Sequence, residues 1–438
     1  MNSSKSLKQY REELLKKYKG KDVNSLPTPS FVVDLDVVSA NTAKMVNGLS
    51  MVSNKLRFRP HVKTHKTAEI AAIQVTSDGA VVASTLSEIR GLIELVDTGV
   101  VKDVLYGIPP TKSKIADLAV LVKTMIAKGG VLRLMIDNVE QLYWLRDFAN
   151  HSADEFPIWS VFFKVNVGDN RAGQVADSEQ LTEMIYEAVE LVNDQYVELY
   201  GFYAHAGGSY SSTDVATAMA YLTREIEGVH AAAEVARNMM HKTDLDANTN
   251  HRFVISVGAT PTAHTSARGG LPAVSALLGA ALDDDDVEVH AGNYAILDMQ
   301  QVATGLVSPA DVAGYVVAEV IGYYPERDEY LIDAGVLALA REPGRIPGIA
   351  TIKHQAVSGD RYIVGRVSQE HGILCRRTDV IEDVIEEVGK GESTLKWKAG
   401  GKVLLLPQHA CITSSMYQWY FAVQNGLISD VLLPWRGW

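Results

Sequence analysis

Two lysines and two histidines alternate within the stretch RPHVKTHK, residues 59–66. These side chains can act as amine nucleophiles, acids or bases near neutral pH. The apolar residues before them indicate a short strand, and alternate side chains of a strand share a face. We therefore expect His61, Lys63 and His65 to point one way, with Lys66 beyond the strand at the start of the next turn or helix. Alternatively, both lysines are merely solvated.

Eight short apolar runs between about residues 56 and 292 are each followed by polar or glycine-rich residues and then by a segment with helical spacing. This pattern is typical of repeated βα units. Eight such units match a (β/α)8 barrel, which takes roughly 250 residues, and a doubly wound open sheet is the alternative. After about residue 305 the chain indicates strands linked by turns. We predict an α/β barrel over residues 28–305 and a β-rich domain over residues 306–438, on which residues 1–27 can pack.

Residues at the carboxyl ends of barrel strands are the candidates for chemistry, because barrel enzymes place their active sites there. Lys63 ends the first predicted strand, and Arg171 and Tyr203 follow or end later ones. The last two strands lead into the glycine-containing turns VGATPT, residues 257–262, and HAGNY, residues 290–294. Barrels most often hold a phosphate at these two loops. A strand-end lysine opposite a phosphate site predicts pyridoxal phosphate bound as a Schiff base.

The amino-acid composition indicates which kinds of molecule the protein binds. The formal net charge of −12 argues against nucleic acid, whose binding needs a basic surface. The charged N-terminal segment and the absence of long apolar runs predict neither an export signal nor a membrane anchor. With only two cysteines, Cys375 and Cys411, a disulfide framework is not expected, which favours a reducing, cytosolic setting. A small-molecule substrate is the predicted partner.

Several stretches in combination resemble the eukaryotic D-serine dehydratases: RPHVKTHKT, ASTLSEI, KVNVGDNRAG, FYAHAGGSY, SVGATPT, EVHAGNYAILDMQ and PQHAC. These enzymes belong to the alanine-racemase-like class of pyridoxal phosphate enzymes, together with the D-threonine aldolases and the D-threo-3-hydroxyaspartate dehydratases. The resemblance extends from residue 26 through PQHAC. It implies an N-terminal barrel, a C-terminal β domain and a homodimer with active sites near the interface.

The resemblance also implies roles for particular residues. Lys63, and not Lys66, would bind the cofactor and then remove the Cα proton of a D-amino acid. A lysine acts as a base at neutral pH only when its charged form is disfavoured, and we expect cationic crowding by His61, His65 and Lys66 to contribute. Arg171 would lie near the phenolic oxygen of the cofactor, and Tyr203 would line the site. Besides these, the implied cofactor-binding residues are His61, Gly258, Thr260, Gly292, Asn293 and Tyr294.

The motif PQHACIT sets His409 two residues before Cys411. On an extended segment both side chains would share a face, and imidazole and thiolate are preferred zinc ligands. Taken alone, such a pair is equally a structural feature. Within the resembled class, however, this motif is similar to that of the dehydratases, whereas the aldolases carry aspartate in place of the cysteine. The resemblance therefore implies a zinc ion.

Together with these features, the resemblance implies a D-serine dehydratase that uses pyridoxal phosphate and zinc to convert D-serine into pyruvate and ammonia. Zinc would bind the β-hydroxyl as a Lewis acid. The alternatives within this class of enzymes are a D-threo-3-hydroxyaspartate dehydratase and a D-threonine aldolase. Either would use the same lysine, Lys63. Outside the enzymes, a non-catalytic pyridoxal phosphate carrier is the remaining alternative, although such carriers resemble the barrel alone.

Overall fold

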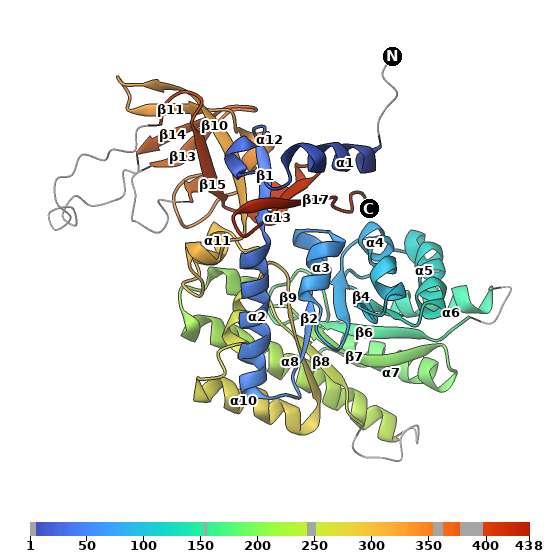
Figure 1. Cartoon of the computed structure of the whole chain (residues 1–438). Coiled ribbons are helices and arrows are strands. Elements are labelled where there is room, and N and C mark those ends of the chain that lie inside the picture. The colour runs from blue at the N-terminus through green and yellow to red at the C-terminus, as the bar shows by residue number, and fades with distance from the viewer. Residues whose placement is uncertain (1–5, 153–155, 243–250, 354–361, 377–396) are drawn as a thin grey trace. The chain divides into compact units, whose positions relative to one another are not determined.

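The computed structural model describes residues 6–152, 156–242, 251–353, 362–376 and 397–438 (Figure 1). The chain divides into two compact units. One comprises residues 42–294 with residues 435–438, and the other comprises residues 1–41 with residues 295–434. Among the described residues, no helix is both long enough and apolar enough to cross a membrane.

The first unit is built on eight parallel strands in the order β2-β9-β8-β7-β6-β5-β4-β3. A parallel bridge between His61 and Val82 brings the two end strands together, so the sheet is a nearly closed barrel. This confirms the predicted barrel over the open-sheet alternative. The strands are β2 (Arg57–Pro60), β3 (Ala80–Ala83), β4 (Asp103–Tyr106), β5 (Val131–Ile136), β6 (Trp159–Val165), β7 (Val197–Ala204), β8 (Val254–Val257) and β9 (Asp286–Ala291).

Helices alternate with these strands because apolar residues recur on one face of each. Several begin with a side-chain cap, as where Thr85 accepts a hydrogen bond from the backbone N–H of Glu88. The helices are α2 (Leu35–Val52), α3 (Ala68–Gln74), α4 (Leu86–Asp97), α5 (Ile115–Ala127), α6 (Val139–Asn150), α7 (Glu179–Asn193), α8 (Val215–Lys242), α9 (Thr260–Ser266) and α10 (Pro272–Asp284).

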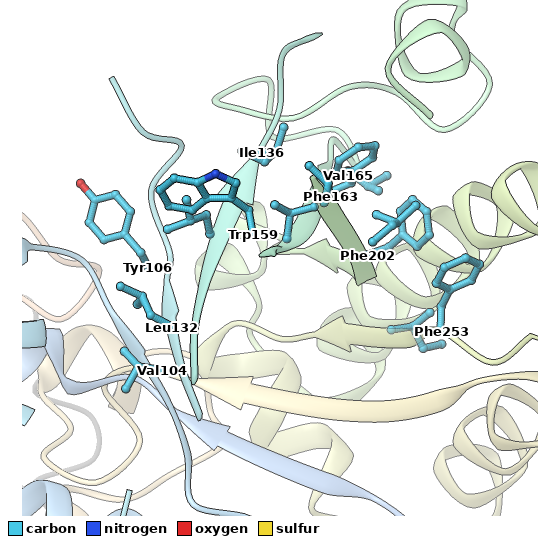
Figure 2. Packing of buried hydrophobic residues seen from close by; sticks show 14 of the residues in the cluster. Val104, Tyr106, Leu132, Ile136, Trp159, Phe163, Val165, Phe202 and Phe253 are labelled. Carbon is cyan, nitrogen blue, oxygen red and sulfur yellow. The ribbon is translucent and has the colours of Figure 1, made fainter. Parts of the chain in front are cut away.

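Strand alternation divides the barrel residues into two sets. In β6, Val161 and Phe163 belong to the main apolar cluster that includes the surrounding helices, part of which Figure 2 shows. Phe162, between them, belongs to a separate small cluster with inward residues of other strands. Lys164 follows on the same inward face, which sets its side chain toward the cavity described below.

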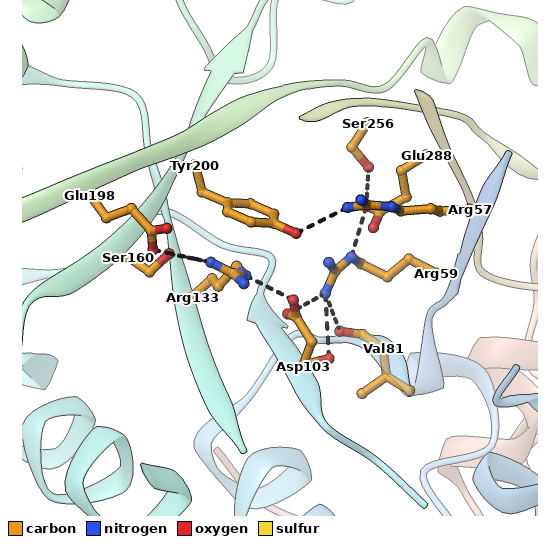
Figure 3. Close-up of polar contacts among 10 residues, drawn as sticks. All are labelled: Arg57, Arg59, Val81, Asp103, Arg133, Ser160, Glu198, Tyr200, Ser256 and Glu288. Atoms are coloured by element: carbon orange, nitrogen blue, oxygen red, sulfur yellow. Dashed lines mark hydrogen bonds and ion pairs between the residues drawn. The ribbon is translucent and has the colours of Figure 1, made fainter. Parts of the chain in front are cut away.

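Charged side chains form a network among the barrel strands (Figure 3). Arg59 is 1% exposed, and it forms ion pairs with Glu288 at 2.7 Å and with Asp103 at 2.7 Å. Arg133 pairs with the other oxygen of Asp103 at 2.8 Å and also contacts Ser160. Burial lowers the pKa of Arg59, but the two carboxylates outweigh it and raise that pKa. The buried charges therefore compensate one another, as isolated ones would not.

The second unit contains a nine-stranded sheet in the order β11-β14-β13-β12-β15-β10-β1-β16-β17. Strand β1 (Ser30–Asp34) pairs antiparallel with β10 (Gly314–Tyr324) and parallel with β16 (Tyr420–Gln424), so the N-terminal strand belongs to this sheet. The C-terminal part of the chain is β-rich as predicted, but this unit also takes in residues 28–41 and 295–305, which the prediction gave to the barrel. Its other strands are β11 (Glu329–Ile332), β12 (Ala350–Ile352), β13 (Tyr362–Val367), β14 (Gly372–Arg376), β15 (Lys402–Pro407) and β17 (Leu427–Leu432), with helices α1 (Leu7–Tyr18), α11 (Met299–Val302), α12 (Val336–Leu339) and α13 (Ala410–Ser415).

Candidate active site

A cavity of about 370 Å³ opens at the carboxyl ends of the barrel strands. Its size falls in the range of small-molecule sites. It is lined by predicted site residues and by others that the sequence reasoning did not select. The lining includes Lys63, Lys164, Arg171, Tyr203, His290 and Gly292.

The segment after β2 is a 3-10 turn, Val62–Thr64, and not an extended continuation of the strand. His61 and Lys63 line the cavity. The expectation that His65 shares their face is wrong, because the turn directs it elsewhere. His65 is 1% exposed, and its ring nitrogens contact Thr67 at 3.2 Å and Gln74 at 2.8 Å.

His61 has a defined ring orientation beside Lys63. Its Nδ1 accepts a hydrogen bond from the backbone N–H of Lys63 at 3.2 Å, so its Nε2 carries the proton that is shared with Ser84 Oγ at 2.9 Å. Burial, followed by the charge of Lys63, lowers the pKa of His61 well below its ordinary value. His61 is therefore neutral at neutral pH.

Lys66 lies outside the lining of the cavity and pairs with the buried Glu88 at 2.9 Å. That Lys63, and not Lys66, is the reactive lysine stays a prediction. The predicted cationic crowding of Lys63 by its three neighbours is not supported, however. His61 is neutral, burial lowers the pKa of His65 to about 4, and the charge of Lys66 is compensated by Glu88.

Lys164 is a second cavity lysine, which the sequence reasoning missed. Its Nζ lies 4.6 Å from the centre of the Tyr203 ring, and the residue is 7% exposed. Within the described part of the chain, no carboxylate forms an ion pair with it. Burial, followed by the charge of Arg171, lowers the pKa of Lys164 to about 7. Strand alternation in KVNVGDNRAG could have identified it, because Lys164 shares the inward face of Phe162.

This shifted pKa gives a testable pH dependence of stability. Between about pH 7 and the ordinary lysine value of about 10.4, the unfolded chain holds this proton and the folded chain has released it. The folded state therefore gains stability as the pH rises, by up to about 1.4 kcal/mol per pH unit. In urea unfolding of the cofactor-free protein, Lys164→Met should lack this gain between pH 7.5 and 9. Lys112→Met, the same change at an exposed residue, should follow the wild type; equal slopes for all three proteins would contradict the assignment.

Three aromatic rings form one wall of the cavity. Tyr203 stacks on His290, with ring centroids 4.0 Å apart and planes 12° from parallel, and His205 lies 6.2 Å from His290. His205 Nδ1 donates to the Gly258 carbonyl at 2.8 Å. Burial, followed by the charges of Lys164 and Lys63, lowers the pKa of His205 to about 3. This wall is therefore uncharged.

The predicted phosphate turns lie side by side at the ends of β8 and β9. Thr260 Oγ1 accepts a hydrogen bond from the backbone N–H of Asn293 at 3.1 Å, which joins the two turns. Gly258 has a φ of +148°, and a Cβ there would lie 2.0 Å from the His290 carbonyl oxygen, so only glycine fits. Of the predicted cofactor-binding residues, Gly258, Thr260, Asn293 and Tyr294 are not among those that line the cavity. Tyr294 is fully buried and packs edge-to-face on Phe58 at 5.1 Å.

The cavity fits pyridoxal phosphate by its chemistry. Lys63 supplies an amine, and a Cβ at Gly292 would lie 3.1 Å from Lys63 Cε, so the glycine keeps the space beside this amine open. Arg171 and Lys164 supply positive charge for an anionic cofactor. His290 Nε2 is buried without a hydrogen-bond partner among the described residues. These features suit a ligand that carries a carbonyl, an anion and a polar ring.

The predicted metal pair lies in the second unit. His409 is the N-cap of α13 and Cys411 is the second residue of that helix, so the segment is not extended as predicted. The two side chains nevertheless interact. Burial lowers the pKa of His409, but its hydrogen bond to Cys411 and the nearby negative charges raise that pKa to about 9. Glu342 is one of these charges, with its Oε2 3.7 Å from His409 Nδ1.

His409 and Cys411 could supply two of the ligands of a zinc ion, but not a complete set. Imidazole and thiolate suit zinc, and two protein ligands leave positions open for water or substrate. Among the described residues, no group of three or more histidine, cysteine, aspartate or glutamate side chains is arranged to hold a metal ion. A metal ion at His409 and Cys411 would therefore need ligands besides these two side chains.

Comparison with known proteins places the chain in a family. Residues 33–250 match the alanine racemase N-terminal domain, and residues 313–423 match a serine dehydratase domain. The chain is 38% identical to a D-serine dehydratase of Schizosaccharomyces pombe, covering 98% of this chain and 96% of the relative. It is 32% identical to the D-serine dehydratase of Saccharomyces cerevisiae, covering 97% and 100%.

A solved structure supports the same placement. D-threo-3-hydroxyaspartate dehydratase from Delftia sp. HT23 superposes with a TM-score of 0.74 at 25% identity, covering 95% of this chain and 100% of that chain. The agreement in sequence and fold extends over both units. The chain therefore belongs to the D-serine dehydratase family of enzymes, whose N-terminal domain is alanine-racemase-like.

Proposed function

We propose that this enzyme is a pyridoxal phosphate-dependent D-serine ammonia-lyase that converts D-serine into pyruvate and ammonia. The observation that carries the proposal is Lys63, whose amine enters the barrel-end cavity next to Gly292 and the neutral His61. The relatives named D-serine dehydratase, which match over nearly the whole chain, support the substrate.

In this proposal the bound cofactor supplies an electron sink that acidifies the Cα proton of the amino acid. Lys63 Nζ accepts that proton. Arg171 and Lys164 balance negative charge of the cofactor and substrate, and the stacked Tyr203 and His290 bound the cavity. Loss of the proton and of the β-hydroxyl as water leaves aminoacrylate, which hydrolyses to pyruvate and ammonia.

We further propose that His409 and Cys411 hold a zinc ion that binds the β-hydroxyl as a Lewis acid. Their mutual contact supports this assignment. Solved structures of the related D-threo-3-hydroxyaspartate dehydratase include a histidine-to-alanine mutant, and also a cysteine-to-alanine mutant in the metal-free form. Those two mutated positions are two residues apart, as His409 and Cys411 are. A homodimeric assembly and a cytosolic location remain predictions.

A second substrate is favoured by one feature of the cavity. Arg171 provides a cationic group besides Lys63, and Lys164, whose pKa is about 7, would become one beside an anion; a second carboxylate on the substrate would need such a partner. D-threo-3-hydroxyaspartate is therefore the alternative substrate, and D-threonine cleavage to glycine and an aldehyde is a further one. A carrier without catalysis is disfavoured by the family relationship over both units.

The test measures the keto acid and the ammonia that the enzyme releases from each of four candidate substrates: D-serine, L-serine, D-threonine and D-threo-3-hydroxyaspartate. We expect D-serine to give pyruvate and ammonia in equal amounts and L-serine to give neither, because Lys63 delivers its amine from one strand end only. Comparable rates on both enantiomers would contradict this and would indicate a second base, for which Lys164 is the candidate. Oxaloacetate from hydroxyaspartate as the main product would reassign the substrate.

A further inference from the structure

His290 lines the cavity although it is only 3% exposed. Its Nδ1 lies 3.1 Å from Ser256 Oγ, whereas its Nε2 has no hydrogen-bond partner in the part of the chain that the structure describes. Buried polar atoms are almost always hydrogen-bonded, so an unpaired one at a cavity calls for an explanation. A bound ligand is the simplest one here.

A hydrogen-bonded chain continues from Ser256 into the barrel (Figure 3). Ser256 Oγ donates to Glu288 Oε1 at 2.8 Å, and Arg59 Nε donates to the same oxygen at 2.7 Å. Arg59 is in turn fixed by Asp103 at 2.7 Å. A carboxylate that faces a guanidinium accepts hydrogen bonds and donates none. The single hydroxyl proton of Ser256 therefore points to Glu288.

This arrangement decides which nitrogen of His290 carries a proton. The hydroxyl of Ser256 donates its only proton to Glu288, so Ser256 Oγ can only accept a hydrogen bond from His290. His290 Nδ1 must therefore be the donor. Burial, followed by the charges of His205 and Lys164, lowers the pKa of His290 well below its ordinary value, so the ring is neutral and has one proton. Nε2 is then a lone-pair acceptor.

The backbone carbonyl of Gly258 is a neighbouring group that raises the pKa of His290. The Gly258 carbonyl favours a proton on His290, but it already accepts a hydrogen bond from His205 Nδ1 at 2.8 Å. The ring of His290 is also held in plane by its stack on Tyr203, at 4.0 Å. The chain through Ser256 favours a proton on Nδ1, because a proton on Nε2 instead would leave Nδ1 and the Ser256 oxygen as two acceptors 3.1 Å apart.

The acceptor at Nε2 matches one group of the cofactor. The phosphate and the phenolate of pyridoxal phosphate accept hydrogen bonds, whereas its protonated ring nitrogen donates one. That nitrogen lies para to the aldehyde carbon. His290 sits within β9 in register with Arg59, while Lys63 lies beyond the end of β2, nearer the cavity mouth. A ring whose aldehyde meets Lys63 can thus turn its nitrogen inward.

We propose that Ser256, Glu288 and Arg59 hold His290 as the Nδ1–H tautomer, so that its Nε2 accepts a hydrogen bond from the protonated ring nitrogen of pyridoxal phosphate. His290 is then a cofactor-binding residue, and the other three are positioning residues. The inference rests on the proposed function. A proton kept on the ring nitrogen strengthens the electron sink on which the elimination depends.

The tautomer can be measured without the cofactor. Solid-state ¹⁵N spectra of histidine-labelled, cofactor-free protein separate protonated from unprotonated ring nitrogens, and His290→Gln assigns the signals. We expect an unprotonated Nε2 in the wild type and a growing Nε2–H population in Ser256→Ala. Ser160→Ala, which removes a buried hydroxyl that contacts Arg133 in the same barrel, should leave the signals unchanged. A protonated Nε2 in the wild type would overturn the proposal.

Cofactor binding gives the second test. We compare pyridoxal 5′-phosphate with an analogue in which a C–H replaces the ring nitrogen, measuring Kd by fluorescence titration. The wild type should prefer the natural cofactor by about tenfold or more, as expected for a hydrogen bond to a charged group. His290→Phe should lose this preference, and His290→Gln, which keeps an acceptor, should restore part of it.

These outcomes separate the two proposals. If the wild type binds both compounds equally well, the role of His290 is refuted while the function can stand. If the wild type binds neither compound, the proposed function fails, and the inference about His290 fails with it. Should His290→Phe not fold, the loss of preference in Ser256→Ala tests the same hydrogen bond.

Discussion

Lys63→Ala is expected to lower turnover of D-serine by roughly 10⁴-fold, because in the proposed mechanism it removes the amine that would bind the cofactor and take up the Cα proton. The variant should also lose the visible absorbance that marks a lysine-bound cofactor, which is a readout independent of activity. The change is small for the fold, since Lys63 points into a cavity. Absorbance spectra and a pyruvate assay of the purified variant check both effects.

Lys66→Ala is the matched control, three residues along the chain. Lys66 lies outside the cavity lining and pairs with Glu88, whose side chain is 0% exposed. We expect the variant to keep the absorbance and the activity but to unfold at a lower Tm, because a buried carboxylate loses its cation. If Lys66→Ala lost the absorbance and Lys63→Ala kept it, the assignment of the reactive lysine would be refuted.

Local sequence patterns predicted the barrel well because each βα unit repeats the same short-range signal. They could not show that β1 leaves the barrel and pairs with β10 and β16, since these strands lie hundreds of residues further along the chain. Strand β1 lies between these two partners inside the sheet, and local patterns carry no signal for contacts between segments so far apart in the sequence. The sequence pattern predicted that the C-terminal part is rich in strands, but it did not predict that β1, near the N-terminus, belongs to the same sheet.

The same limit applies to the candidate site. Glycine and lysine at strand ends gave strong signals, and Lys63 and Gly292 do lie together. His65 was misplaced because the strand ends at Pro60 and a 3-10 turn replaces the two-residue alternation. Lys164 and His290 were missed although both stand in stretches that the sequence reasoning selected. Their importance comes from burial beside other charges, which is a property of the folded barrel.

A strong chelator should abolish dehydration while leaving the cofactor absorbance intact, if His409 and Cys411 bind an essential zinc ion. The reason is that the two sets of ligands are separate: the cavity with Lys63 belongs to one unit and the metal pair to the other. Zinc should restore the chelated wild type. Manganese should do so poorly, because a thiolate ligand favours zinc over harder ions.

Cys411→Ala should reproduce the effect of the chelator and resist rescue by zinc. Cys375→Ala is the matched control, since Cys375 is the other cysteine and lies in β14, where burial raises the pKa of its thiol; this variant should keep both zinc and activity. If Cys411 were only a packing residue, its loss would lower stability by about 1 kcal/mol and leave catalysis intact. Metal analysis decides, because the zinc proposal requires about one zinc per chain in the wild type and none in Cys411→Ala. An active enzyme without metal would remove zinc from the mechanism, whereas the place of the chain in the D-serine dehydratase family would stand on its sequence identity to the relatives.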